Sequence, residues 1–159
     1  MGSEQRSSTH DYATETPWTP PAGPDVTLVP AGRWWDAIKV PTFVGIPALD
    51  RLARTGAVIH DGFAARMYWF IPPGTGRAWD WPALQQVELH STTTYVAVPA
   101  AHHTCPPGLH WHVPPTGGCL TDPAGLQRAL REVVDTALGP RPATVDVLTR
   151  RTRQQRACR

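Results

Sequence analysis

Residues 57–74 read AVIHDGFAARMYWFIPPG, and this stretch decides the fold that the sequence predicts. Val58 and Ile59 form a short apolar run that stops at Asp61-Gly62, a pair of residues typical of turns. The run from Arg66 to Ile71 is rich in aromatic and β-branched residues and ends at two prolines and a glycine. The two runs are therefore predicted to pair as a β-hairpin.

Helical patterns lie on both sides of this hairpin. Residues 45–56, GIPALDRLARTG, carry an apolar stripe, with Pro47 in the expected first turn and a glycine after the last turn. Residues 122–138, DPAGLQRALREVVDTAL, follow a capping Thr121 or Asp122. One apolar face at helical spacing is made by Leu126, Leu130, Val133, Val134 and Leu138. Two main helices are predicted.

Four further apolar runs are short enough to be strands. They are Val26–Val29, Val87–Leu89, Tyr95–Val98 and Leu109–Val113. The last two are predicted to pair as a second hairpin, with the histidines of LHWHV on its solvated face. The sequence thus predicts an α+β domain with a small, mostly antiparallel sheet packed with two main helices.

The 159 residues divide by composition into three parts. Residues 1–24 are polar and proline-rich, and they are predicted to be a disordered N-terminal arm, whose Trp18 could dock on the domain. Residues 25–140 hold the predicted α+β domain. Residues 141–159 hold a short run of arginines and are predicted to be a basic C-terminal tail.

Charge and cysteine content favour some classes of protein over others. A net charge of +2 does not argue for a protein with a broad basic face for nucleic acid. There is no apolar run of about 18 residues and no signal-peptide core, so no membrane partner is expected. Three cysteines, an odd number, fit reduced thiols. The expected compartment is the cytoplasm.

A group of histidines and cysteines near the second predicted hairpin offers donors for zinc. The candidate metal ligands are Cys105, His110, His112 and Cys119, and His103, His110 and His112 are also candidate residues for binding a ligand. On a strand, His110 and His112 would lie on one face and could chelate together. None of the usual zinc-ribbon or zinc-finger spacings occurs, so solvated loop and edge histidines are the competing interpretation.

Other candidate residues sit beside the predicted strands. Asp61 and Glu88 could hold Mg²⁺, which prefers carboxylate oxygens, or they could be a turn aspartate and a surface glutamate. Arg66 and Trp69 could bind a nucleobase and its phosphate, whereas the competing interpretation places the tryptophans in the core. The chain has no P-loop and no G-x-S-x-G or H-E-x-x-H motif.

Residues 56–113 resemble the N-terminal prim-pol domain of bifunctional DNA primase/polymerases. Arg66-Met67-Tyr68-Trp69 resembles that family's H-L-Y-F strand, and Glu88-Leu89-His90 falls where its D-V-R step stands. The run from Tyr95 to Ala101 resembles Y-V-V-A-P-P-S, and His110-Trp111-His112 resembles the closing aromatic-x-W strand. The strand that ends at Asp61 resembles the one that bears the first catalytic acids. Short actinobacterial proteins with GRWWDA, YWFxPPGT and YVxVP…HW steps are also similar.

The chain departs from the prim-pol pattern at its catalytic positions. The family's D-x-D becomes Asp61-Gly62-Phe63, and its motif histidine becomes Arg66. The resemblance therefore implies a degenerate, non-enzymatic binding module that contacts nucleic acid, a nucleotide or a protein partner. The alternatives are a Mg²⁺-dependent nucleotidyl transferase that uses Asp61 and Glu88 and a small zinc-binding protein.

Overall fold

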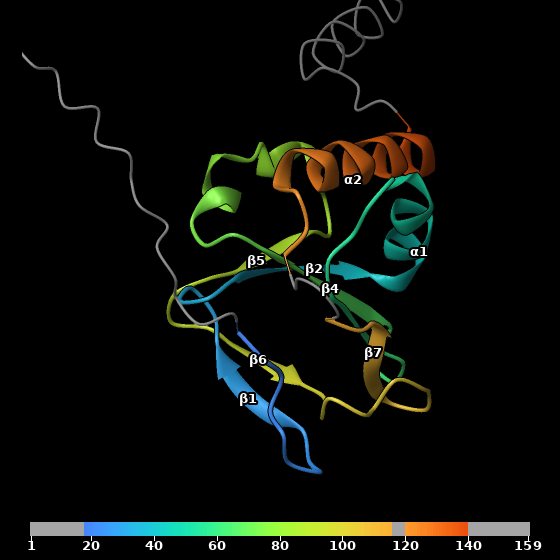
Figure 1. The fold of residues 1–159 in the computed structure, drawn as a ribbon. Coiled ribbons are helices and arrows are strands. Elements are labelled where there is room, and N and C mark those ends of the chain that lie inside the picture. The colour runs from blue at the N-terminus through green and yellow to red at the C-terminus, as the bar shows by residue number, and fades with distance from the viewer. Residues whose placement is uncertain (1–17, 116–119, 140–159) are drawn as a thin grey trace, which may run out of the picture.

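A computed structural model describes residues 18–115 and 120–139, and these residues form seven strands, two α-helices and two 3₁₀ turns (Figure 1). The elements are β1 (Thr27–Pro30), β2 (Asp36–Pro41), α1 (Thr42–Arg51), β3 (Val58–Asp61), β4 (Arg66–Ile71), η1 (Thr75–Ala78), η2 (Trp81–Ala83), β5 (Glu88–His90), β6 (Tyr95–Val98), β7 (Leu109–Val113) and α2 (Pro123–Leu138).

Five strands form an antiparallel sheet in the order β5-β2-β4-β3-β7, and β1 and β6 form a separate antiparallel pair. Both α-helices lie on one side of the five-stranded sheet, and the β1–β6 pair lies on the other side (Figure 1). The predicted α+β fold with a mostly antiparallel sheet and two main helices is confirmed.

Four neighbouring strands follow the split β-α-β, or ferredoxin-like, order. The chain leaves β2, crosses through α1 to β3, and returns as β4 between them, while β5 adds to the free edge of β2. A second crossover helix would ordinarily join β4 to β5, but that segment holds only η1 and η2. The helix layer is completed instead by α2, which follows β7.

The predicted β3–β4 hairpin is confirmed. Asp61 and Arg66 face each other at its end, and Asp61 Oδ1 accepts hydrogen bonds from the backbone N–H groups of Phe63 and Ala64 at 3.1 and 3.0 Å. These bonds close the turn because a short carboxylate side chain can satisfy the N–H groups two and three residues onward. Asp61 therefore has a structural role in the turn.

The helix predicted at residues 122–138 is confirmed. Asp122 caps it, with Oδ2 accepting from the N–H of Gly125 at 2.7 Å, and Pro123 is its first residue. The first helix differs from its prediction, because α1 begins at Thr42 and Pro47 lies inside it. The five residues before Pro47 fold as helix because their apolar side packs on the sheet.

Two strand predictions need correction. β6 and β7 do not pair with each other, since β6 pairs with β1 and β7 pairs with β3. The central strand β2 was not predicted at all, although it pairs with both β4 and β5. β2 was missed because every residue except Lys39 is buried, on both faces, and such a strand lacks the alternation of polar and apolar residues that marks a half-exposed strand.

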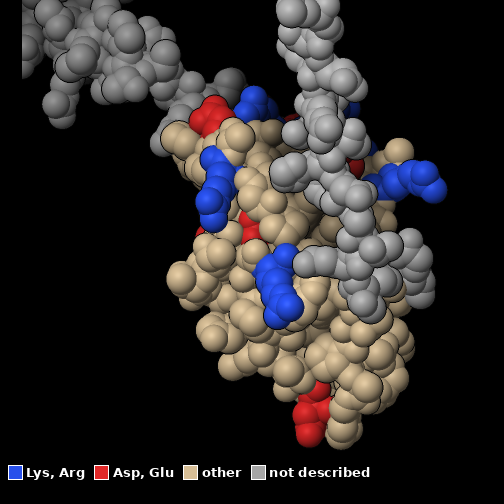
Figure 2. All heavy atoms as spheres, turned by 60° about the vertical axis from the view of Figure 1, so that its left-hand side comes forward, with Lys and Arg blue, Asp and Glu red and all other residues tan. Residues whose placement is uncertain are grey.

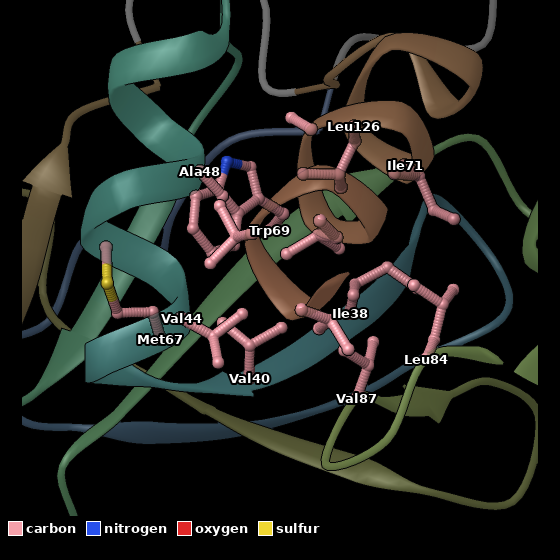
Figure 3. Close-up of a cluster of buried hydrophobic side chains, with 14 of the residues drawn as sticks. Ile38, Val40, Val44, Ala48, Met67, Trp69, Ile71, Leu84, Val87 and Leu126 are labelled. Carbon is pink, nitrogen blue, oxygen red and sulfur yellow. The ribbon is translucent and has the colours of Figure 1, made fainter. Parts of the chain in front are cut away.

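The sheet separates two apolar clusters. The helix-side core contains Ile38, Val40 and Trp69 from the sheet, Val44 and Ala48 from α1, and Leu126 from α2 (Figure 3). The second core lies between the sheet and the β1–β6 pair, and it contains Trp35, Phe70 and Trp111. The two cores hold most of the large apolar side chains, as the hydrophobic effect requires.

Trp18 belongs to the folded part of the chain. Its ring meets those of Trp35, Phe70 and Trp111 edge-on, with centroids 5.7, 5.6 and 6.5 Å away. Residues 18–24 of the predicted arm are described, whereas its residues 1–17 and the predicted basic tail at 141–159 lie outside the described residues. Within the described ranges, no helix has the length and apolar content needed to cross a membrane.

Candidate functional sites on the two faces of the sheet

One candidate site, here called the polar sheet face, lies on the side of the sheet away from the helices. Side chains alternate between the faces of a strand, so Tyr68 shares its face with Phe70 of the second core. The register places Lys39 beside Tyr68 and Glu88 beside Lys39. The polar sheet face consists of Lys39, Asp61, Arg66, Tyr68, Glu88 and His90, none of which is buried.

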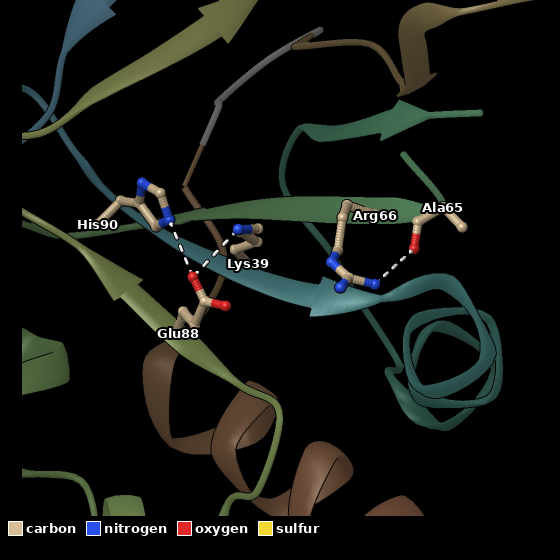
Figure 4. A network of polar contacts seen from close by, with 5 residues as sticks. All are labelled: Lys39, Ala65, Arg66, Glu88 and His90. Atoms are coloured by element: carbon tan, nitrogen blue, oxygen red, sulfur yellow. Dashed lines mark hydrogen bonds and ion pairs between the residues drawn. The ribbon is translucent and has the colours of Figure 1, made fainter. Parts of the chain in front are cut away.

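Charged groups on the polar sheet face hold one another in place (Figure 4). Lys39 Nζ donates to Glu88 Oε2 at 3.1 Å, and His90 Nε2 lies 3.7 Å from the same oxygen. The hydrogen bond from Lys39 lowers the pKa of Glu88. Further along β4, the Arg66 guanidinium donates to the carbonyl of Ala65 at 3.3 Å. The face thus offers two cations and an aromatic ring to a ligand.

Tyr68 is the aromatic centre of this face. It is half-buried on β4, one of the inner strands, and its ring lies 6.1 Å from that of His90. Burial raises the pKa of Tyr68, and the charges of Asp61 and Glu88 raise it further, against the opposing effect of Arg66. The phenol therefore stays neutral at neutral pH and presents a flat ring and a hydroxyl group.

Asp61 and Glu88 share this face but do not meet. Asp61 lies on β3 and Glu88 on β5, with β2 and β4 between them. Three strand-to-strand steps amount to about 14 Å, whereas Mg²⁺ binds oxygen at about 2.1 Å. The structure therefore does not bring these two carboxylates to one shared ion.

The second candidate site is a histidine cluster on the helix side of the sheet, made by His60, His110 and His112. One possible ligand atom from each ring lies within 4.8 Å of those of the other two. The centroid of the His60 ring is 5.2 Å from that of His110 and 6.0 Å from that of His112, in edge-to-face arrangements. His110 is buried, His60 is half-buried and His112 is exposed.

Each inner histidine of the cluster has a hydrogen bond at one ring nitrogen. His110 Nδ1 lies 3.0 Å from the carbonyl oxygen of Gly108, and His60 Nε2 lies 3.2 Å from the hydroxyl of Thr42. Burial lowers the pKa of His60, and repulsion from His110 and then His112 lowers it further, partly offset by Asp61. Burial and His110 also lower the pKa of His112.

The other predicted site residues lie in different places. Trp69 is fully buried in the helix-side core, so its prediction as a ligand-binding side chain is corrected. His103 is exposed, and its carbonyl accepts from the N–H of Trp111 at 2.8 Å. Cys105 is exposed and lies outside the histidine cluster, while Cys119 is outside the described residues. His110 and His112 do share a face, but His110 is not solvated as predicted.

Sequence reasoning missed His60, Lys39 and His90. His60 is the third residue of β3, directly opposite His110 on β7. The pairing of these two strands could not be derived from local pattern, and β2, which carries Lys39, was not predicted. The only sequence signal for the histidine cluster was the His110-x-His112 pair together with His60 in another predicted strand.

A separate cleft of about 370 Å³ lies between α1 and α2. Some of its charged side chains are engaged, since Arg51 Nε lies 3.7 Å from Glu132 Oε2 and Asp122 caps α2, and Arg54 and Arg128 also line it. Exposed ion pairs of this kind contribute little to stability.

Replacing His90 with glutamine is expected to flatten the dependence of stability on pH. Burial and Lys39 lower the pKa of His90 below its ordinary value, partly offset by Glu88. Because of this lowered pKa, the unfolded chain binds more protons than the folded chain as pH falls below about 6.5. The stability that His90 contributes is therefore complete above about pH 6.5 and is lost as pH falls through the folded-state pKa. Urea unfolding of the chelator-treated protein between about pH 7.5 and 5.5 measures this change.

The control for this prediction is His102→Gln, because His102 is exposed in the loop before β7. His60 and His112, whose pKa values are also lowered, keep part of the acid dependence in both variants. An unchanged pH profile in the His90 variant would contradict the assignment.

Comparisons with protein-family models, with curated proteins and with solved structures found no match to this chain. Function is therefore argued from the two sites themselves.

Proposed function

We propose that the chain is a non-enzymatic binding module whose polar sheet face holds a nucleotide, either free or within a single strand of nucleic acid. The observation that carries the proposal is the position of Tyr68. Its ring lies on an inner strand, on the face away from the helices, with Lys39 on the neighbouring strand and Arg66 two residues earlier on its own strand. A base can stack on the ring while the cations meet its phosphates.

The fold topology supports this by analogy. RNA-recognition domains present aromatic side chains on the open face of a four-stranded sheet, and bases stack on them. The order β5-β2-β4-β3 is the same split β-α-β arrangement, and Tyr68 lies on its third strand along the chain. This is a likeness of arrangement, so the ligand has to be argued from the side chains.

The charges of the face favour a short or single-stranded ligand over a duplex. Lys39 is paired with Glu88, and Arg66 lies opposite Asp61, so the four charges nearly cancel. In the view of Figure 2 the Lys and Arg side chains form separate patches, some of them beside acidic side chains, and no continuous basic surface is seen. Binding that depends on many phosphate contacts needs a continuous basic surface. Stacking is therefore expected to contribute more of the affinity than phosphate contacts.

The proposal agrees with the resemblance to a prim-pol domain whose catalytic positions are altered. Asp61, Arg66 and Glu88, the positions compared with that family's site residues, lie on one face of the sheet. A two-metal reaction requires its carboxylates close together, and here two strands separate them. We therefore propose binding without nucleotidyl transfer. The exposed free thiol of Cys105 suits a reducing compartment, and the proposal places the module in the cytoplasm.

Replacing Tyr68 with leucine is expected to weaken binding of the nucleotide ligand about 5- to 150-fold, because loss of one base–aromatic stack costs about 1–3 kcal/mol. The measurement is fluorescence anisotropy with labelled single-stranded DNA and RNA, and with a labelled nucleotide, at low salt. The three probes decide between a free nucleotide and a strand as the ligand.

The matched control is Tyr95→Leu. Tyr95 is an exposed tyrosine on β6, where Val96 and Val98 fill the second core and Tyr95 points away from it. A second pair compares Arg66→Gln with Arg128→Gln, since Arg128 is exposed on α2, on the opposite side of the sheet. Equal losses in the Tyr68 and Tyr95 variants, or no binding of any probe by the unaltered protein, would overturn the proposal.

A further inference from the structure

We propose that His60, His110 and His112 form a binding site for a divalent transition-metal ion, with zinc as the expected occupant. The site lies on the helix side of the sheet, on the opposite face from Tyr68. It therefore stands independently of the proposed nucleotide site.

Strand pairing builds this site from two elements that are far apart in the sequence. His60 faces His110 directly across the β3–β7 pair, and His112 follows two residues later on the same face. The register shifts between Val58 and Ile59, where β7 has one extra residue. Such a bulge increases local twist and redirects side chains. The bulge lies at His112 on β7, where the ring of His112 joins the rings of His60 and His110.

The hydrogen bond of His110 determines which of its nitrogens is available. A backbone carbonyl can only accept, so Nδ1 of His110 carries the proton that is donated to Gly108 at 3.0 Å. In the neutral ring, Nε2 then presents a lone pair. The hydroxyl of Thr42 can accept from His60 Nε2, and in that tautomer Nδ1 of His60 also presents a lone pair.

Both hydrogen bonds have the form of the outer contacts that surround metal-binding histidines. Such histidines usually donate their second ring N–H to a carbonyl, a carboxylate or a similar acceptor, which fixes the orientation of the ring. The carbonyl of Gly108 and the hydroxyl of Thr42 occupy these positions for His110 and His60. Two of the three rings are therefore held in place before any ion arrives.

The donor set selects the class of ion. Imidazole nitrogens suit zinc, copper, nickel and iron, whereas magnesium and calcium prefer oxygen. Three protein ligands leave a fourth tetrahedral position, as in zinc sites that keep a bound water. Burial falls from His110 through His60 to His112, so the site opens toward solvent on the His112 side. Solvent can therefore supply the fourth ligand.

The test uses the full chain purified without a histidine tag and stripped of metal with a chelator. Zinc is then added in competition with a chromophoric chelator, and bound zinc is counted after dialysis. One zinc per chain is expected, together with a higher unfolding temperature, because an ion that binds the folded state stabilises it. Cobalt in the same site should give the visible absorption of a tetrahedral ion.

The variants His112→Gln and His60→Gln are each expected to weaken zinc binding by more than about 100-fold, and Thr42→Val by about 10-fold or more, since outer contacts contribute about 10- to 100-fold. His102→Gln is the control, being an exposed histidine outside the cluster. His112 is itself exposed, so its replacement should leave the fold intact.

Two results would overturn the site. One is the absence of stoichiometric zinc in the unaltered protein. The other is zinc that is retained by the His60 and His112 variants but lost when Cys105 and Cys119 are replaced by serine. The second result would assign the ion to the cysteine-containing group that the sequence had suggested.

Discussion

Replacing Trp69 with alanine is expected to lower the free energy of unfolding by about 3–5 kcal/mol, because removal of a large buried aromatic side chain leaves a cavity in a close-packed core. Trp69 is fully buried on β4 and packs beneath both helices, beside Ala48 and Leu126 (Figure 3). Small domains are stable by only about 5–15 kcal/mol, so much of the total stability would be lost. Urea unfolding followed by circular dichroism measures the loss.

A second variant separates packing from hydrogen bonding at this position. Trp69 Nε1 donates to Thr55 Oγ1 at 3.2 Å. Trp69→Phe keeps most of the apolar volume and removes this bond, so a smaller loss of about 1–2 kcal/mol is expected. If Trp69→Ala instead kept its stability and lost only ligand binding, Trp69 would be a binding residue after all and the core assignment would be wrong.

The Gly32→Ala substitution is expected to lower the free energy of unfolding by about 2–5 kcal/mol, from about 1–2 for a left-handed backbone and about 1–3 for overpacking. Gly32 has φ +91°, and a Cβ atom there would lie 2.7 Å from Thr92 N and 2.9 Å from Thr92 Cα. These are backbone atoms, so no rotation of a side chain relieves the contact. The same unfolding measurement applies.

Gly74→Ala is the matched control for Gly32→Ala. Gly74 also has a positive φ, +81°, but a Cβ atom there would meet nothing within 4 Å. Only the backbone cost of about 1–2 kcal/mol is then expected. Equal losses in the two variants would show that the close approach of Gly32 to Thr92 is unimportant.

The elements that the sequence predicted correctly are those specified by neighbouring residues. The β3–β4 hairpin needs only the turn at Asp61 and two flanking apolar runs. The helix α2 carries its own cap at Asp122 and a continuous apolar face. Both signals lie within a few residues of the structure they form, so local stereochemistry is enough to identify them.

The elements that it missed depend on distant partners. β2 is paired on both edges and buried on both faces at every residue except Lys39, so it shows no local alternation. β6 and β7 are consecutive along the chain and would ordinarily pair. They separate because β7 completes the edge of the main sheet at β3, while β6 joins β1 over the second core.

The candidate sites divide in the same way. The sequence identified the types of residue that the sites use, including Arg66, His110 and His112, because basic, aromatic and imidazole side chains can be recognised one at a time. It did not place His60 beside His110, or Lys39 beside Tyr68, because each of these pairs depends on strand register. Asp61 and Glu88 show the converse, since two promising carboxylates lie on strands separated by two others.

By itself, then, the sequence determined the fold class, the first hairpin and the second helix, because each is specified by periodicity, capping and turn residues within a short segment. Only the tertiary structure decided which strands are neighbours. That choice placed three histidines together on the helix side and Tyr68 between charged residues on the other side. Strand pairing is decided by burial of the two cores over the whole chain, and no local pattern encodes it.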